Sequence, residues 1–162
     1  MGDLLRFKLG PRRGLRRGTS ATAWYELGRA VEATEPARAM AAYERALAGC
    51  PDLADASNNL GRLHHDRGEV AVAESYYRIA LCVDGEVALY WFNLGVSVED
   101  QGRVSEAIGH YERALAIDAG LADAHYNLAR LYELIGRRSA DELVLRRAVR
   151  HLVRYRDLAR VG

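Results

Sequence analysis

One short pattern, Ala-x3-Tyr-x2-Ala, recurs three times in this chain at a constant interval. Its copies begin at Ala39, Ala73 and Ala107, which are 34 residues apart. A leucine followed by a small residue precedes each copy and occurs once more after the last: Leu27-Gly28, Leu60-Gly61, Leu94-Gly95 and Leu128-Ala129. Fixed periods of about 20 to 50 residues are typical of stacked structural repeats. The sequence therefore predicts an array of similar units instead of one globular core.

Each unit is expected to be a pair of helices. Alanine and leucine are abundant, and the 162 residues include only three prolines, a composition that favours helices. Three glycines fall where the first helix of a unit should end, and we expect each to supply the positive φ of that turn: Gly68, Gly102 and Gly136. The glycines of the Leu-Gly pairs fall inside the first helix, where glycine costs about 1 kcal/mol relative to alanine. This repeated cost predicts close packing of another helix, with Tyr43, Tyr77 and Tyr111 filling the adjacent space.

At these positions the chain resembles the tetratricopeptide repeat family, in the form found in bacterial repeat proteins. The third unit shows the family's pattern clearly, at Trp91, Leu94, Gly95, Gly102, Ala107, Tyr111 and Ala114. The resemblance implies an all-α fold, an α-solenoid of about four antiparallel helix pairs with a C-terminal capping helix. It places the units at 21–53, 54–87, 88–121 and 122–162, after a basic, flexible tail at 1–20.

The first unit departs from this pattern between its helices. It is one residue shorter than the others there and has Thr34-Glu35-Pro36 in place of the glycine turn. Threonine is a good N-cap, and proline suits the first helical turn because its missing N–H has no partner there. We therefore expect Thr34 to cap the second helix and Pro36 to occupy its first turn.

The fourth unit has two readings. Read in phase, its second helix places Asp141, Leu145 and Ala148 at the positions of the pattern. Read with an insertion between the helices, it places Ala148, Leu152 and Tyr155 there, which is a better match. Either reading predicts one long helix, roughly 139–160. A terminal repeat needs a polar outer face, and three arginines on one stripe would supply it: Arg146, Arg150 and Arg154.

An asparagine occupies the same place in the first helix of three units: Asn59, Asn93 and Asn127. First helices line the concave side of such arrays, so a ladder of amides could hold the backbone of an extended peptide. This arrangement is similar to the substrate-binding arm of O-GlcNAc transferases, which are superhelical members of the family. The alternative is that each asparagine only bridges or caps neighbouring helices. Four side chains near the row are expected to contact the peptide's side chains: Arg62, Arg130, Phe92 and Tyr126.

These features predict a non-catalytic scaffold or adaptor that binds a segment of a partner protein in its concave groove. No catalytic residues and no cofactor are expected, because the sequence has neither a nucleophile with its base nor a phosphate-binding loop. No metal is expected at His64, His65 or His125, since no cysteine or carboxylate completes a ligand set. A receptor for acidic chaperone tails is disfavoured, because the family's carboxylate clamp uses lysine. The only lysine here is Lys8, outside the repeats.

The charge distribution leaves other functions open. Residues 1–20 carry five arginines and one lysine against one acid, residues 137–162 carry eight arginines against three acids, and the repeats between are acidic. The basic ends could contact nucleic acid, but the tail is too short for a helix-turn-helix, which makes nucleic acid the weaker alternative. The tail could also lie against the acidic groove of its own chain or of a neighbour. Copies could associate into a homo-oligomer through the open ends of the solenoid or through the tail.

The sequence also predicts where in the cell the protein is located. No apolar run approaches the roughly 20 residues that a membrane-spanning helix needs, so no membrane span is expected. The N-terminus lacks the apolar middle region of a secretory signal. Cys50 and Cys82 have no metal-ligand spacing and are expected to be free thiols. A cytoplasmic protein is the prediction.

Overall fold

The computed structural model describes residues 19–160, and within that range the chain forms eight α-helices and no strand. The helices are α1 (Ala21–Val31), α2 (Pro36–Gly49), α3 (Ala54–Asp66), α4 (Val70–Val83), α5 (Ala88–Asp100), α6 (Val104–Ile117), α7 (Ala122–Ser139) and α8 (Glu142–Ala159). The tail predicted at residues 1–20 lies outside the described residues, apart from its last two positions.

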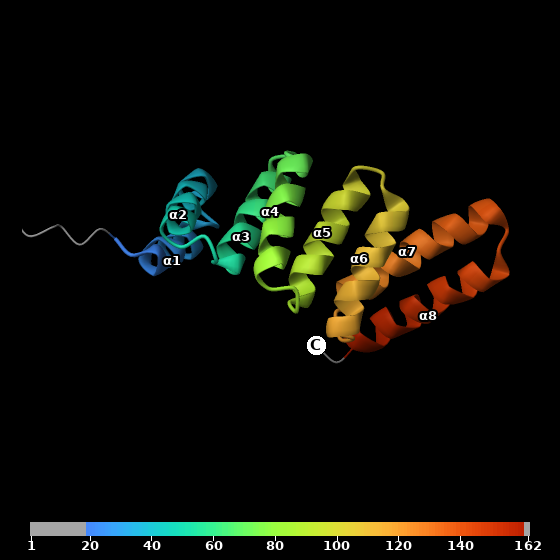
Figure 1. Ribbon diagram of the computed structural model, residues 1–162. Coiled ribbons are helices and arrows are strands. Elements are labelled where there is room, and N and C mark those ends of the chain that lie inside the picture. The colour runs from blue at the N-terminus through green and yellow to red at the C-terminus, as the bar shows by residue number, and fades with distance from the viewer. Residues whose placement is uncertain (1–18, 161–162) are drawn as a thin grey trace, which may run out of the picture.

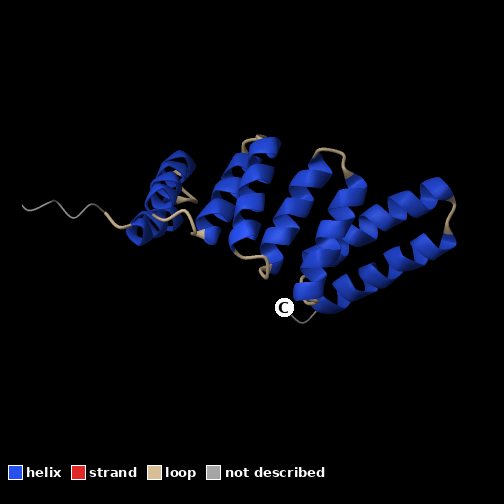
Figure 2. Cartoon of the chain, in the orientation of Figure 1, coloured by secondary structure: helices blue, strands red, loops and turns tan. Residues whose placement is uncertain are grey.

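The helices form four antiparallel pairs that follow one another along the array (Figure 1, Figure 2). α1 and α2 lie at one end of the array, and α7 and α8 lie at the other (Figure 1). The second helix of each pair contacts the first helix of the next pair. This architecture confirms the predicted all-α solenoid. We call the surface formed by α1, α3, α5 and α7 the first-helix face.

The mid-helix glycines allow the two helices of each of the first three pairs to pack closely. A Cβ atom at Gly95 would lie 2.7 Å from the ring of Tyr111, much closer than two carbon atoms can approach. The same relation holds in the two preceding pairs, between Gly28 and Tyr43 and between Gly61 and Tyr77. The predicted close approach is therefore confirmed, and the group that approaches is the tyrosine ring of the second helix. Glycine is needed here for space and not for an unusual backbone angle.

Two of the three predicted glycine turns are confirmed. Gly68 and Gly102 have φ values of 77° and 78°, in the left-handed region that glycine adopts without strain. The prediction for Gly136 is wrong, because this residue lies inside α7. A Cβ atom at Gly136 would lie 2.8 Å from the side chain of Leu145, so this glycine also serves close packing. The chain turns later, at Ala140, whose φ is 54°.

Contacts within the last pair decide between the two readings of the fourth unit. Gly136 meets Leu145, and the rings of Tyr126 and Tyr155 lie 5.2 Å apart. In an antiparallel pair these contacts place Ala129 opposite Leu152, which is the reading with an insertion. α8 spans Glu142–Ala159, so the predicted long terminal helix is present.

The turn between α1 and α2 is built differently from the prediction. The Thr34 hydroxyl donates a hydrogen bond to the carbonyl oxygen of Val31, at 3.3 Å, and does not cap α2. Glu35 precedes the helix without a side-chain cap bond, and Pro36 is its first residue, as predicted. The hydroxyl therefore satisfies the end of α1 instead of the start of α2.

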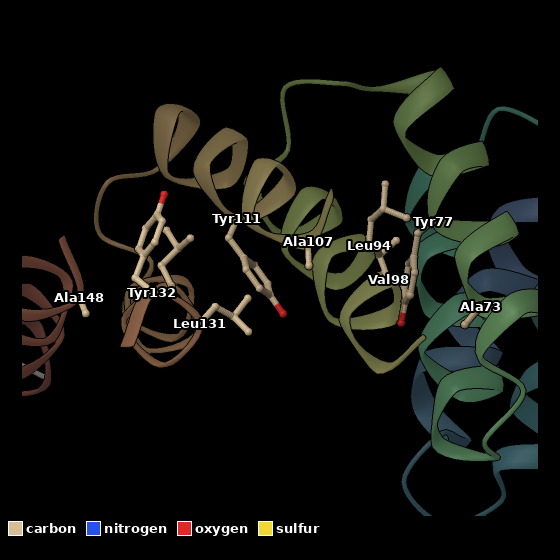
Figure 3. Packing of buried hydrophobic residues seen from close by; sticks show 10 residues of the cluster. Ala73, Tyr77, Leu94, Val98, Ala107, Tyr111, Leu131, Tyr132 and Ala148 are labelled. Carbon is tan, nitrogen blue, oxygen red and sulfur yellow. The ribbon is translucent and has the colours of Figure 1, made fainter. Parts of the chain in front are cut away.

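Buried side chains run through the array in two clusters. The smaller one lies among the first three helices and contains Ala39, Met40, Tyr43, Ala56, Leu60 and Leu63. The larger one extends from Ala73 and Tyr77 to Tyr132 and Ala148, as Figure 3 shows. Burial of each large apolar side chain contributes roughly 1.5–3 kcal/mol. Most of the stability therefore comes from packing within pairs and between neighbouring pairs.

The outer surface of α8 is less polar than predicted. Arg146, Arg150 and Arg154 are exposed, as the capping interpretation requires. Apolar side chains are exposed beside them, however: Leu143 at 70%, Val149 at 60%, Leu152 at 52% and Val153 at 42%. The terminal helix therefore presents a mixed basic and apolar surface.

Candidate functional site

Four side chains connect the first pair to α3, at what we call the first junction. The buried Tyr43 hydroxyl donates to Glu32 Oε2 at 2.7 Å, and Asn59 Nδ2 donates to the same hydroxyl at 3.3 Å. Arg62 of α3 forms an ion pair with Glu32, the residue that follows α1. Burial raises the pKa of Tyr43, and the hydrogen bond from Asn59 opposes that shift. The four groups tie one repeat to the next.

The third junction, between the third pair and α7, repeats this arrangement. The buried Tyr111 hydroxyl donates to Glu99 Oε2 at 2.8 Å. Arg130 of α7 pairs with the other oxygen of Glu99. Burial raises the pKa of Tyr111, and a side-chain hydrogen bond from Asn127 lowers it by less. These residues hold the same places as their counterparts at the first junction.

The second junction, between the second pair and α5, uses other residues at those places. His65 stands where the other junctions have glutamate, and Val96 stands where they have arginine. His65 Nε2 lies 2.7 Å from Asp100 Oδ2 across the junction. Asn93 Nδ2 donates to Asn58 Oδ1 at 2.8 Å instead of to a tyrosine. Both partners of the ion pair have changed together, so neither charge is left without its counterpart.

A buried carboxylate supplies a further connection at the second junction. Gln101 Nε2 donates to Glu74 Oε2 at 2.6 Å, and Arg103 Nη1 donates to Glu74 Oε1 at 2.8 Å. Burial alone would raise the pKa of Glu74, but these hydrogen bonds and the charges of Arg78 and Arg103 lower it. This cluster was not predicted from the sequence. The available signal was an acid at a place that holds Met40 in the first pair and Ile108 in the third.

The predicted row of asparagines lies on three successive first helices. Each amide is partly buried: the nitrogens of Asn59 and Asn93 donate across the junctions described above, and Asn127 lies close enough to Tyr111 to affect its pKa. These are the contacts of the bridging interpretation. Among the described residues, no hydrogen bond to the carbonyl oxygens of Asn59, Asn93 or Asn127 is formed. The same amides are therefore fixed in position and retain acceptor capacity.

The four predicted neighbours of the row differ in accessibility. Arg62 and Arg130 keep 45% and 48% of their side chains exposed while they pair with Glu32 and Glu99. The other two are aromatic: Phe92 is partly buried with its ring 5.7 Å from that of Tyr111, and Tyr126 is 46% exposed.

A pocket of about 470 Å³ lies at the α7–α8 end of the array. Its polar wall comes from α7, and its apolar wall comes mainly from α8. The lining residues are Tyr126, Ala129, Arg130, Glu133, Arg137, Leu145, Ala148, Val149 and Leu152. The pocket is therefore open to a partner with an apolar surface and a charged edge.

A pair of histidines connects α7 to α8. His125 Nδ1 lies 2.9 Å from His151 Nδ1, and His125 Nε2 lies 3.2 Å from the carbonyl oxygen of Ala119. Burial lowers the pKa of His151, and the neighbouring His125 lowers it further. Within residues 19–160, no group of three or more His, Cys, Asp or Glu side chains is arranged to hold a metal ion. None of the described helices is long and apolar enough to span a membrane.

Comparison with protein families identifies the repeats. Models described as tetratricopeptide repeat match residues 29–86, 60–122 and 99–151. The chain belongs to the tetratricopeptide repeat family. Members of this family are generally non-catalytic scaffolds, and the repeats make this chain a protein–protein interaction scaffold. No curated protein matches its sequence.

Several solved structures share this repeat fold. A crystal structure of MamA matches with a TM-score of 0.76 at 19% identity, over 88% of this chain and 80% of that chain. MamA 41-end from Desulfovibrio magneticus RS-1 has a TM-score of 0.73 at 17% identity, over 90% of this chain and 78% of that one. The first TPR of Spaghetti (RPAP3), bound to the HSP90 peptide SRMEEVD, has a TM-score of 0.69 at 19% identity, over 72% and 94%. These likenesses show the fold.

Proposed function

We propose that the first-helix face binds an extended segment of a partner protein. The observation that supports the proposal is the asparagine row, in which Asn59 and Asn93 are held in place by hydrogen bonds across the junctions. A fixed row of partly exposed acceptors can receive backbone N–H groups of a peptide without having to be ordered on binding. Asn59, Asn93 and Asn127 would contact the backbone, which favours a partner with few sequence requirements at those points.

The neighbouring side chains would add specificity. Tyr126 offers an exposed ring beside the pocket of α7 and α8, and Phe92 offers a smaller apolar surface next to Asn93. Arg62 and Arg130 each retain N–H donors that their glutamate partners do not use. Because Glu32 and Glu99 largely neutralise these arginines, a strongly acidic peptide such as the one bound by RPAP3 is not the expected ligand.

The test is affinity capture from a lysate of the source organism with four forms of the full chain. The forms are the wild type, Tyr126→Ala, an Asn59/Asn93/Asn127→Ala triple variant, and the control Ile79→Ala. Ile79 is similarly exposed but lies on α4, a second helix. Each form is checked by thermal unfolding, because the triple variant also loses bonds to Tyr43 and Asn58.

We expect a protein that the wild type and Ile79→Ala retain and that the two folded variants of the first-helix face lose. If the triple variant unfolds, Tyr126→Ala still tests the binding site. The Tyr126 side chain makes no hydrogen bond within the described residues, so its loss should leave the fold intact. Equal retention by the wild type, Tyr126→Ala and the triple variant would exclude the first-helix face as the binding site.

A further inference from the structure

The last pair leaves exposed a surface that, in the first and third pairs, is covered by the next helix of the array. At the first and third junctions, the arriving helix buries an alanine and two leucines against the preceding pair. These residues are Ala56, Leu60 and Leu63 in α3, and Ala124, Leu128 and Leu131 in α7. In the last pair, the pocket between α7 and α8 occupies the corresponding place. We call it the end slot.

The end slot carries the same acidic group as the junctions that precede it. Glu133 of α7 holds the place that Glu32, directly after α1, and Glu99 of α5 hold in the earlier pairs. At both of those junctions the glutamate forms an ion pair with an arginine of the next helix. Glu133 instead pairs with Arg137 on its own helix, and half of its side chain remains exposed. The slot therefore has an acid at the point where an arriving arginine would bind.

The other wall of the slot is apolar and accessible. Val149 is 60% exposed and Leu152 is 52% exposed, both on α8. Leu152 lies opposite Ala129, where the earlier pairs have a tyrosine opposite glycine. Because that tyrosine is missing, an arriving helix would find no hydroxyl for an asparagine to bind.

α1 has the features that this slot requires. It carries Ala23, Leu27 and Arg29 at the places of Ala56, Leu60 and Arg62 in α3, and the smaller Ala30 at the place of Leu63. Ala23 is exposed and Leu27 is only half-buried, whereas their counterparts in α3 are completely buried. Arg29 is 59% exposed, and its ion pair within the described residues is a 3.6 Å contact with Glu26 on the same helix.

One difference between α1 and the other arriving helices agrees with two features of the slot. Glu26 stands where α3 and α7 have asparagine, and the slot has Leu152 where such an asparagine would need a tyrosine. Arg137, exposed on the polar wall, offers Glu26 an opposite charge. α1 and the end slot are therefore complementary in their apolar residues and in both charges.

We propose that copies of this chain stack end to end, with α1 of one copy in the end slot of the next and Arg29 paired with Glu133. The contact joins two different surfaces, so each added copy presents a new free end and the assembly grows as an open chain. The apolar residues supply the attraction, and the charges set the orientation. The end slot shares Tyr126 and Arg130 with the proposed peptide site, so the variants below change Arg29, Glu133 and Val149, which lie outside that site.

The first experiment measures mass against concentration by sedimentation velocity, over roughly a hundredfold range of full-length protein. Reductant keeps Cys50 and Cys82 from cross-linking copies. We expect the wild type to grow in mass with concentration and Val149→Asp to remain a monomer. Val72→Asp, at an exposed valine of α4, is the matched control and should behave as the wild type does. Val149 is largely exposed, so its substitution leaves the core intact.

The second experiment exchanges the charges. Arg29→Glu alone and Glu133→Arg alone should each weaken association about fivefold or more, because like charges then meet at the contact. An equimolar mixture of the two variants should associate again, and so should the double variant, because opposite charges meet in both cases. Glu44→Arg, at an exposed acid of α2, controls for the change in net charge.

Three results would overturn the proposal. The first is a wild-type protein that stays monomeric at every concentration, as it would if the slot serves a helix of a foreign protein. The second is an association that Val149→Asp leaves unchanged. The third is a mixture of Arg29→Glu and Glu133→Arg that associates no better than either variant alone.

Discussion

The first and third junctions use one set of contacts, and the second junction uses another, although the helices stack in the same order. At the first and third, a buried tyrosine, a glutamate and an arginine connect the pairs, next to leucines at Leu63 and Leu131. At the second, Ser97 takes the leucine's place and donates to the carbonyl oxygen of Val70 at 2.9 Å. At this junction Glu74 also accepts hydrogen bonds from Gln101 and Arg103.

The comparison shows what the repeat requires and what it leaves free. The glycine and tyrosine that close each pair are present at both kinds of junction, because they fill space within a pair. The residues that connect pairs vary, provided that the two partners vary together. At the second junction His65 contacts Asp100, and Val96 replaces the arginine at the place where no glutamate is present to pair with it.

The largest expected effect tests the tyrosine hydroxyl. Tyr111→Phe removes the hydrogen bond to the Glu99 carboxylate and should lower the free energy of unfolding by about 1.5–3 kcal/mol. Tyr77→Phe, at the second junction, should change it by less than about 0.5 kcal/mol, since no such bond is made there within the described residues. Urea unfolding followed by circular dichroism measures both. Equal losses at the two positions would contradict the division between junctions.

The next effect concerns Glu74 and pH. Its pKa is lowered in the folded protein, so its bonds contribute stability above the unfolded value of 4.5. That contribution should disappear as the pH falls from 4.5 through the folded-state value. Glu74→Gln should cost about 1 kcal/mol at neutral pH. The difference between wild type and variant should shrink as the pH is lowered, in urea titrations at a series of pH values. A difference that is constant with pH would show that the carboxylate charge is unimportant.

The smallest effect tests whether the charged pairs can be exchanged between junctions. Arg130→Val should cost about 0.5–1 kcal/mol, because the ion pair with Glu99 is half exposed. Val96→Arg alone should gain nothing, whereas His65→Glu with Val96→Arg should show a favourable coupling of about 0.5–1 kcal/mol. A double-mutant cycle from urea unfolding gives the coupling. Strictly additive single effects would mean that the paired change at the second junction has another cause.

Much of the fold could be predicted from particular residues. The recurrence of Ala39, Ala73 and Ala107 at 34-residue spacing gave the repeat, and the Leu-Gly pairs indicated close packing within each pair. Local space and local backbone angles decide these features, so they are visible in one unit. The turn predicted at Gly136 was wrong, because a glycine can serve either a positive φ or close packing. Only its contact with Leu145 distinguishes the two.

The candidate site was predictable only in part. The sequence placed Asn59, Asn93 and Asn127 on one side of the array but left open whether they bridge helices or face a peptide. The donors of Asn59 and Asn93 are used by Tyr43 and Asn58, which come from the preceding pair. No single unit contains both partners of such a bond. The connection through Glu74 was missed because it too depends on residues from the following pair.

The sequence by itself determined the family, the helix pairs and the residues that close the first three pairs, because those contacts recur at fixed spacing along the chain. Only the tertiary structure decided how neighbouring pairs are connected and how the fourth pair is aligned. It also showed that the end of the array keeps an acid and an apolar wall exposed. Contacts across a junction depend on how two separate units are stacked, and the spacing within one unit carries no record of that stacking.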